Sequence, residues 1–394
     1  MTGKVLATFN VGSSSLKLAA YGATPAGGLG PRLLRAEIDG LPGAPKLSAV
    51  AEDSARARTF LASADISDLE LSVLAPRLIM AIDAALDHPL AAVGHRVVQG
   101  GMHSHTSRAA TPELIAQLDS LGPLAPDHQP YNLAPIRALN AARPDLPQTV
   151  SFDTAFHRTQ PRIAQMYALP RALTDSGMMR YGYHGLSYAH SARRLPEHCP
   201  AHRLALTLAL LLGSGSSLCA ILDGQSIATS MGFSALSGVP MATRCGDVDP
   251  GLLLYLMSDR HMSIDDVSLM LRKQSGLLGV SGISGDLRQL EASCTAEADE
   301  AIALYIYRIV RECGSHISAL GGIDALVFTG GVGENSAHVR SGIAAGLAWA
   351  GISIEAEANR QGARVLSPDG APASVFVLPA DEESEIARDC LALL

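Results

Sequence analysis

Apolar residues along the chain fall into short runs separated by small polar residues and by stretches with helical spacing. At the N-terminus, residues 4–9 and 15–21 are apolar runs on either side of "NVGSS", which predicts two strands joined by a turn at 10–14. The Gly/Pro-rich stretch 22–46 is typical of an exposed loop with an edge strand, and the Ala/Leu-rich stretch 55–90 is largely helical in pattern.

Three punctuated segments follow. "AAVGHRVVQGG" predicts a short strand that runs into glycines. "TPELIAQLDSLG" predicts a helix with Thr111 as N-cap, Pro112 at its first position and Gly122 after its end. "LPQTVSFDTAFH" predicts a strand that carries Asp153 at its carboxyl end.

The second half of the chain repeats the pattern of the first. "LTLALLLGSGSSLCAI", which starts at Leu206, can be laid over "VLATFNVGSSSLKLAA", which starts at Val5, and Asp223–Gly224 then predicts a further hairpin turn. A single Gly-Ser turn is usually only a hairpin turn of small residues. Two such turns about two hundred residues apart predict a duplicated α/β domain, with a ligand between the halves and each turn facing its phosphates.

Later segments extend the alternation of strands and helices. "DEAIALYIYRIVRECGSHISAL" and "HVRSGIAAGLAWAG" predict helices, and "DALVFTGGVGEN" predicts a buried strand that opens into a Gly-rich turn. "SVFVLPADEESEIARDCLALL" predicts a strand and a C-terminal helix with acids at its start. Mixed or mostly parallel sheets covered by helices are therefore expected.

Composition narrows the class of protein. The 394 residues suffice for two domains, and 47% hydrophobic with 17% charged residues is a globular composition. A net charge of −8 argues against a nucleic-acid partner. Six scattered cysteines without a C-x-x-C pair fit a reducing compartment. Without an apolar leader, and with nine residues in the apolar run Leu204–Leu212, the chain is expected to be cytoplasmic and to make no membrane contact.

Nine motifs, spread over residues 9–389, resemble those of the acetate kinase family and occur in the family's order. They are "FNVGSSSLK", "VGHRVVQGG", "LAPDHQP", "SFDTAFH", "RYGYHGLS", "TSMGFSALSGVPMATRCGDVDPG", "SGLLGVSGISGDLR", "VFTGGVGENS" and "DEESEIARD". The resemblance implies an α/β, duplicated, actin-like (ribonuclease H-like) kinase fold of two domains, with the active site in the interdomain cleft. It also implies a homodimer that uses ATP, with Mg²⁺ or Mn²⁺, to convert a short carboxylate to an acyl phosphate, reversibly.

The order of the motifs predicts where the two domains meet. Residues 1–153 with 382–394 are expected to form the first lobe, and residues 154–381 the second, nucleotide-binding lobe.

Phosphoryl transfer to a carboxylate brings two anions together, so its catalysis needs positioned cations and donors. Arg96 in "GHRVV" and Arg244 in "ATRCGD" offer bidentate forks, with His184 in "YHG" as a third donor. Surface salt bridges are the usual role of arginine, but the flanking glycines and the resemblance favour catalysis here.

Asp153 is catalytic by resemblance, and its role depends on the substrate. A carboxylate substrate is already ionised at neutral pH, so Asp153 would orient an arginine or metal-bound water. A hydroxyl substrate would instead make it a general base. A strand-end Asp that caps a turn is the structural alternative.

By resemblance, Asn10 and Glu382 hold the metal, although Glu382 alone would be an ordinary acidic helix start. Lys17 is equally compatible with a phosphate contact and with an edge-strand charge. The residues predicted to bind nucleotide or phosphate are Ser13, Ser15, Lys17, Gly213, Ser214, Gly215, Asp286, Arg288, Gly331, Gly333 and Asn335.

The chain departs from the family's usual motifs at several positions. Leu211 and Ser214 stand where a phosphate-contacting His and an Asn are usual, and Gln99 and Asp381 replace a His and an Asn. Losing one preorganised donor costs roughly 10²–10³ in rate in other enzymes.

The predicted carboxylate pocket consists of Arg96, Val98, Asp127, Tyr183 and Ala235. Val98 is retained, whereas Asp127, Tyr183 and Ala235 stand where Leu, Phe and Pro are usual. The pocket is therefore expected to be roomier and more polar, and an Asp repels a bound carboxylate unless it is protonated or paired.

Three interpretations remain open. The chain is an active carboxylate kinase with an altered preference, a catalytically weakened nucleotide-binding relative with a regulatory or interaction role, or a kinase for hydroxyl groups. The first is favoured, because six of the family's functional residues are present together: Asn10, Arg96, Asp153, His184, Arg244 and Glu382.

Overall fold

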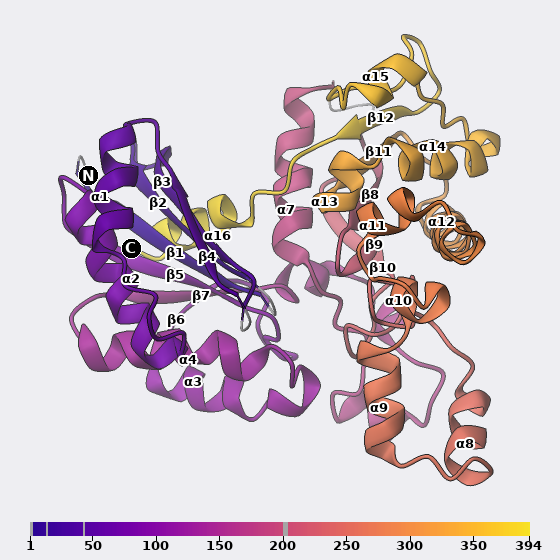
Figure 1. Ribbon diagram of the computed structural model, residues 1–394, viewed down its shortest axis with the longest axis horizontal. Coiled ribbons are helices and arrows are strands. Elements are labelled where there is room, and N and C mark those ends of the chain that lie inside the picture. The colour runs from indigo at the N-terminus through magenta and orange to yellow at the C-terminus, as the bar shows by residue number, and fades with distance from the viewer. Residues whose placement is uncertain (1–2, 13–14, 42–43, 200–203) are drawn as a thin grey trace. The chain divides into compact units, whose positions relative to one another are not determined.

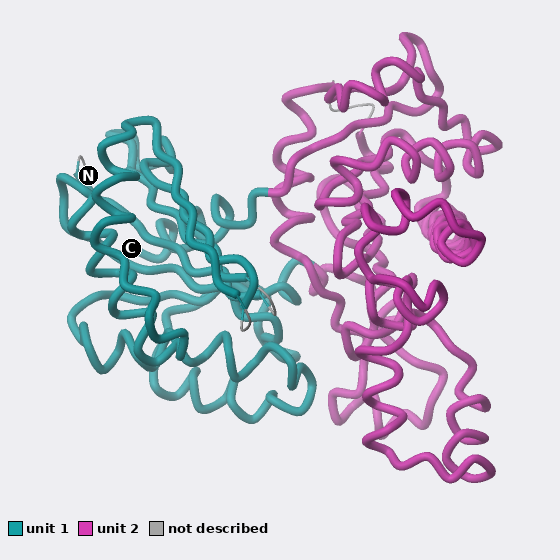
Figure 2. The backbone as a smooth tube through the Cα atoms, in the orientation of Figure 1, with its two compact units in different colours: residues 1–156, 381–394 teal, residues 157–380 magenta. Residues whose placement is uncertain are grey.

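Each of two compact units of the chain is built on one β-sheet. The computed structural model describes residues 3–12, 15–41, 44–199 and 204–394. Unit 1 consists of Met1–Phe156 with Asp381–Leu394, and unit 2 of His157–Ala380 (Figure 2). The predicted cleft site stays a prediction.

The sheet of unit 1 has seven strands in the order β4-β3-β2-β1-β5-β7-β6. The β1–β5 and β5–β7 pairs are parallel and the other pairs are antiparallel. The strands are β1 (Val5–Val11), β2 (Ser15–Ala23), β3 (Leu29–Asp39), β4 (Lys46–Val50), β5 (Leu90–Val97), β6 (Arg108–Ala109) and β7 (Gln148–Phe152). The helices are α1 (Ser54–Ser63), α2 (Leu71–Ala85), α3 (Pro112–Asp119), α4 (Gln129–Ala142) and α16 (Glu382–Ala392) (Figure 1).

Strand β1 is buried on both faces, and its alternation decides where polar groups lie. Val5, Ala7 and Phe9 belong to the core cluster that also contains residues of α1 and α2. Leu6, on the other face, packs with Cys390 of α16. Even-numbered residues of β1 therefore face α16, and the last of them is Asn10.

Alternate residues of strand β5 also face α16. A Cβ atom on Gly94 would lie only 2.7 Å from Ile386 of α16, so the helix and the strand approach each other closely there. Two residues on, Arg96 shares this face. The alternation thus brings Asn10 and Arg96 together at the carboxyl ends of β1 and β5.

The sheet of unit 2 has the order β10-β9-β8-β11-β12, with parallel β8–β11 and β11–β12 pairs and antiparallel β8–β9 and β9–β10 pairs. The same sequence of orientations links β3-β2-β1-β5-β7 in unit 1, so the predicted duplication is confirmed. The strands are β8 (Leu206–Leu212), β9 (Ser216–Leu222), β10 (Gln225–Thr229), β11 (Ala325–Thr329) and β12 (Ser374–Val377).

Helices fill most of the remaining chain of unit 2. They are α5 (Arg162–Gln165), α6 (Arg171–Asp175), α7 (Gly185–Arg194), α8 (Pro250–Ser258), α9 (Ile264–Lys273), α10 (Gly276–Ser281), α11 (Leu287–Ser293), α12 (Ala296–Leu320), α13 (Gly330–Asn335), α14 (Ala337–Gly346) and α15 (Ala356–Arg360).

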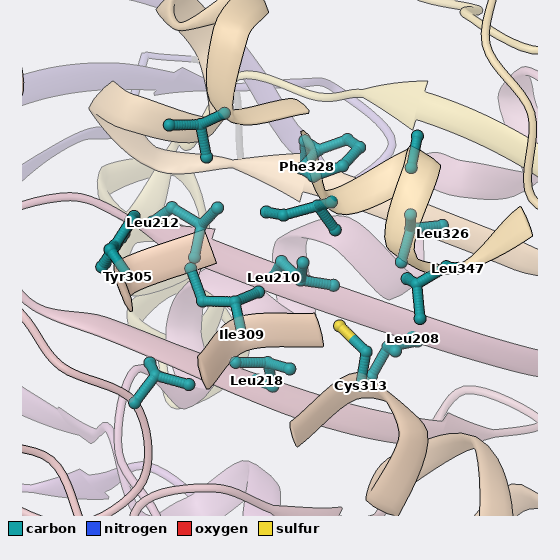
Figure 3. Packing of buried hydrophobic residues seen from close by; sticks show 14 of the residues in the cluster. Leu208, Leu210, Leu212, Leu218, Tyr305, Ile309, Cys313, Leu326, Phe328 and Leu347 are labelled. Atoms are coloured by element: carbon teal, nitrogen blue, oxygen red, sulfur yellow. The ribbon is translucent and has the colours of Figure 1, made fainter. Parts of the chain in front are cut away.

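The core of unit 2 joins β8 to the long helix α12. Leu208, Leu210 and Leu212 pack with Ile309 and Cys313 (Figure 3). This cluster takes the even-numbered positions of β8, so Leu211 points to the opposite face of the strand.

Three local predictions from the sequence were wrong. Asn10 lies within β1 rather than in a turn, since β1 pairs with β2 as far as Val11. The stretch 22–46 contains β3, which pairs with both β2 and β4, so the edge strand is β4. The prediction for α3 was right. Thr111 caps this helix, its Oγ1 accepting from the Leu114 amide at 3.2 Å, and Gly122 lies after its end, where it begins a 3₁₀ helix.

"GGVGEN" was predicted as an open turn, and it forms the short helix α13. Gly330 begins this helix with φ +79°, and a Cβ atom there would lie 2.7 Å from the carbonyl oxygen of Leu212. Only glycine permits both this backbone conformation and this approach to β8.

Within the described part of the chain, none of the helices combines the length and the apolar character that crossing a membrane requires.

Candidate active site

A charged cluster gathers at the carboxyl ends of β1, β5 and β7 in unit 1; its members, here called the Arg96 cluster, are Asn10, Arg96, Asp153, Glu382 and Glu383. Arg96 donates from Nε to Asp153 Oδ1 at 2.9 Å and from Nη2 to Asp153 Oδ2 at 2.6 Å. This is the bidentate fork that arginine makes with a carboxylate. The Asp153 side chain is 1% exposed, so the pair is almost fully removed from water.

Asn10 connects this pair to the start of α16. Its Oδ1 accepts from Arg96 Nη1 at 3.1 Å. Its Nδ2 donates to Glu382 Oε2 at 2.9 Å and to Glu383 Oε1 at 2.8 Å. Both glutamates lie in the first turn of α16, where the helix dipole favours negative charge.

The cluster keeps its arginine charged. Burial lowers the pKa of the Arg96 guanidinium, but the charges of Asp153 and Glu382 outweigh burial, so the net shift is upward. Burial and the charge of Glu382 raise the pKa of the Glu383 carboxyl, against the hydrogen bond from Asn10.

The oxygens around Asn10 fit a hard divalent cation. Carboxylate and amide oxygens are the protein ligands that Mg²⁺ prefers, and Mg²⁺ usually keeps several waters and phosphate oxygens as well. Among the described residues there is no group of three or more His, Cys, Asp or Glu arranged to hold a metal by protein ligands alone. Asn10 and Glu382 are the candidate ligands for such a cation.

Two amide side chains of α4 hold the strand ends that carry this cluster. Asn132 accepts from the Val98 amide at 3.0 Å and donates from Nδ2 to the Val11 carbonyl oxygen at 3.1 Å, which ties β1 to β5. Gln129 accepts from the Gln99 amide at 3.2 Å. Sequence reasoning missed both residues, and their signal was two amides on the buried side of a helix.

In unit 2, the β8–β9 turn meets two cationic or donor side chains. A Cβ atom on Gly215 would lie 3.4 Å from His184 Nε2 and 3.7 Å from Arg244 Nη1. Arg244 is held by its donation from Nη1 to the Ala235 carbonyl oxygen at 3.1 Å. Ser214 accepts from the Ala242 amide at 3.2 Å. The structure therefore brings His184, Arg244 and the predicted phosphate turn together.

The two predicted pocket residues of unit 2, Tyr183 and Ala235, belong to segments that contact each other. Tyr183 is buried and donates from its hydroxyl to the Phe233 carbonyl oxygen at 2.8 Å, two residues before Ala235. In unit 1, Val98 is buried and Asp127 is partly buried just before α4.

The second glycine-rich element lies beside the first. A Cβ atom on Gly213 would lie 3.9 Å from the Gly331 amide nitrogen, and one on Gly333 would lie 3.5 Å from the Phe328 backbone. Asn335 donates from Nδ2 to the Gly331 carbonyl oxygen at 2.8 Å, within α13. The Gly213 and Gly331 backbones thus form one surface in unit 2.

The remaining predicted nucleotide residues are spread more widely. Arg288 is 88% exposed and pairs with Asp286 at 2.7 Å, at the start of α11. Lys17 lies 3.8 Å from Glu37 on the neighbouring strand. Ser15 begins β2, and its carbonyl oxygen accepts from the Gly12 amide at 2.8 Å. Ser13 lies outside the described residues.

Comparisons with known proteins agree with this arrangement. The model of the acetokinase family matches residues 4–388. An acetate kinase of Rhodopseudomonas palustris is 44% identical over 98% of this chain and 97% of its own length. One of Methylocella silvestris is 49% identical over 78% of this chain and 76% of its own length.

Solved structures give the same result. The crystal structure of Porphyromonas gingivalis acetate kinase superposes with a TM-score of 0.82 at 33% identity, covering 99% of both chains. A propionate kinase from Francisella tularensis superposes with a TM-score of 0.81 at 29% identity, covering 98% of both chains.

The duplicated sheets, with the charged cluster at the strand ends of unit 1, are typical of the actin-like kinase class of phosphotransferases. Within that class, the chain belongs to the acetokinase family, so it is a kinase whose acceptor is a carboxyl group. The resemblance read from the nine motifs is confirmed.

Proposed function

We propose that the chain transfers the γ-phosphoryl group of ATP to acetate or another short-chain carboxylate. The observation that carries this proposal is the buried Arg96–Asp153 fork beside Asn10. A carboxylate substrate needs no base, and Asp153 is already engaged in orienting a cation. This makes general-base catalysis on a hydroxyl substrate the weaker alternative.

Each group has a defined role in the proposed reaction. Arg96 binds the acceptor carboxylate, and Arg244 and His184 donate to the transferring phosphoryl group, whose oxygens carry the developing charge. Asn10 and Glu382 would hold magnesium, which when bound neutralises phosphate charge. The glycines of the β8–β9 turn and of α13 let the nucleotide approach the backbone.

The preferred acid is proposed to be polar or longer than acetate, because Asp127 and Ala235 stand where the family usually has Leu and Pro, which favours a more polar and roomier pocket. Hydroxylamine trapping of acyl phosphate, with ATP and magnesium, tests this across formate, acetate, propionate, butyrate and hydroxy acids. Asp127→Leu is expected to lower the KM for unsubstituted acids about fivefold, because it removes an anion near the bound carboxylate. Identical KM values for every acid in the wild type and in Asp127→Leu would show that Asp127 does not contribute to the carboxylate pocket.

Failure of the trapping assay would favour the second interpretation. If ATP binds and no acid yields product, the chain is a nucleotide-binding relative with a regulatory or interaction role. The Leu211 and Ser214 replacements would then account for the lost transfer.

A homodimer is proposed as the working form. Helix α8 has no buried residue although Leu252, Leu254 and Tyr255 lie on it, and Leu254 is 65% exposed. Exposed apolar surface of this kind marks interaction sites. Light scattering is expected to give a dimer for the wild type and a monomer for Leu254→Glu, whereas a wild-type monomer at micromolar concentration would refute the dimer.

A further inference from the structure

Two buried hydroxyl groups lie behind His184, on the Nδ1 side of its ring. His184 Nδ1 is 2.8 Å from Ser217 Oγ, and Ser217 Oγ is 2.5 Å from Tyr188 Oη. Ser217 and Tyr188 are both fully buried. The opposite edge of the ring, with Nε2, faces Gly215. Tyr188 of α7 is thus connected through Ser217 of β9 to the ring of His184.

The buried tyrosine favours one direction for these hydrogen bonds. Burial raises the pKa of the Tyr188 hydroxyl well above its ordinary value, against the hydrogen bonds of Ser217 and the Leu211 backbone, so the hydroxyl keeps its proton. A buried hydroxyl proton requires an acceptor, and Ser217 Oγ is at hydrogen-bonding distance. With Tyr188 as the donor to Ser217, the Ser217 proton is left for His184 Nδ1.

We propose that Tyr188 and Ser217 are positioning residues that hold neutral His184 as the Nε2–H tautomer, with that donor directed at a phosphoryl group bound in the β8–β9 turn. The ligand class rests on the proposed function. The opposite direction would place the proton on Nδ1 and turn a lone pair of Nε2 toward an anionic oxygen, which would repel it.

The backbone at His184 is fixed independently. His184 has φ 61°, a left-handed conformation that is uncommon outside glycine. The preceding carbonyl oxygen, of Tyr183, accepts from His157 Nε2 at 2.9 Å, and His157 Nδ1 lies 2.9 Å from Ser226 Oγ. Burial lowers the pKa of His157 to about 4, so this support stays neutral. The backbone that carries the His184 side chain is therefore held in place. In the proposal, Ser217 determines which ring nitrogen carries the proton.

The tautomer can be measured directly in the resting protein. Long-range ¹H–¹⁵N correlation spectra of the full-length protein with ¹⁵N-labelled histidine distinguish Nε2–H from Nδ1–H, and the His184 signals are identified by their loss in His184→Gln. The wild type is expected to show Nε2–H. Ser217→Ala is expected to give a mixture of tautomers, Tyr188→Phe a partial shift, and Ser217→Thr the wild-type pattern.

A matched control lies on the other face of β9. Tyr305 Oη is 2.9 Å from Ser216 Oγ, a buried Tyr–Ser hydrogen bond of the same kind, so Tyr305→Phe should leave the His184 signals unchanged. In the kinase assay, Ser217→Ala should lower kcat about tenfold with the KM for ATP changed less than threefold, and Ser217→Thr should restore kcat.

An Nδ1–H tautomer in the wild type, unchanged signals in Ser217→Ala, or an unchanged kcat would overturn the proposal. The spectra need no turnover, so a protein that shows the expected tautomers and forms no acyl phosphate would refute the proposed function alone. If Ser217→Ala fails to fold, Tyr188→Phe and Ser217→Thr carry the test.

Discussion

The β1–β2 and β8–β9 hairpins have the same architecture and carry different chemistry. At equivalent positions, Asn10 pairs across the strands with Lys17, and Leu211 pairs with Ser217. The register also differs by one residue, since Val11 pairs with Leu16 whereas Leu212 pairs with Ser216. Four residues therefore lie between the last paired residues of the first hairpin, and three between those of the second.

The surroundings of these positions differ in charge. Asn10 meets an arginine and two glutamates, so the first hairpin belongs to a buried ionic network. Ser217 meets a tyrosine and a histidine, so the second belongs to a network of neutral donors. Duplication supplied one backbone twice. In the proposed reaction, the residues at the ends of its strands divide cation and carboxylate binding from phosphoryl stabilisation.

The largest effect is expected from Arg96→Ala, which breaks the ionic network beside the β1–β2 hairpin. It leaves Asp153 buried without its partner, which costs about 3–5 kcal/mol of unfolding free energy, and it should lower kcat/KM by at least about 10³. Denaturant unfolding and acyl phosphate trapping measure the two effects. Arg143→Ala, which breaks a partly exposed pair with Asp83, serves as control and should cost no more than about 1 kcal/mol. Equal effects of the two variants would contradict the account.

Arg244→Ala removes a donor of the second hairpin and should affect catalysis more than stability. We expect kcat to fall by about 10²–10³, with an unfolding midpoint close to the wild type, because Arg244 is partly exposed and donates to two neutral acceptors, the Ala235 carbonyl oxygen and Met241 Sδ. Arg308→Ala, at an exposed position of α12, should change neither. A large loss of stability with little loss of kcat would give Arg244 a structural role.

Asn132→Ala tests whether catalysis requires the hydrogen bonds by which Asn132 holds the ends of β1 and β5 together. The Val98 amide and the Val11 carbonyl both lose a buried partner, so kcat/KM should fall about tenfold and stability by about 1–3 kcal/mol. Asn140→Ala on the same helix, farther along α4 and exposed, is the comparison. Activity equal to that of the wild type would exclude a positioning role for Asn132.

The smallest effect concerns pH. Burial raises the pKa of Asp389 on α16 to about 6, with a smaller contribution from Glu385 and against the hydrogen bond of Ser151. Because its folded pKa lies above its unfolded value, its stabilising contribution is complete below about pH 4 and is lost as pH rises through 6. Asp389→Asn should therefore stabilise the protein by about 1–2 kcal/mol at pH 7.5 and flatten the change between pH 5 and 7.5, with activity unchanged. Unfolding curves at both pH values measure this, and parallel curves for the two proteins would contradict it.

The sequence predicted the duplication because both hairpins keep apolar strands and a Gly-Ser turn in the same order. It also placed Asp153 at a strand end, from the pattern of "LPQTVSFDTAFH". Asn132 was missed because its role depends on two strand ends that are far from it in sequence. The Tyr188–Ser217–His184 chain was missed because nothing in "HGLSY" shows which β9 residue faces α7.

Errors in the local predictions share a cause. Gly/Pro-rich composition suggested a loop at 22–46 and a turn at "GGVGEN", but pairing on both sides of β3 and close packing of Gly330 on β8 overrode local preference. Tertiary contacts decide such segments, and sequence periodicity does not report them.

The most direct test of the account is a ³¹P NMR spectrum of the purified protein with ATP, magnesium and acetate. The account predicts an acyl phosphate signal that grows with ADP in equal amount, and its absence with Arg96→Ala. Bound ATP with neither acyl phosphate nor ADP, for acetate and for each acid of the trapping series, would contradict it.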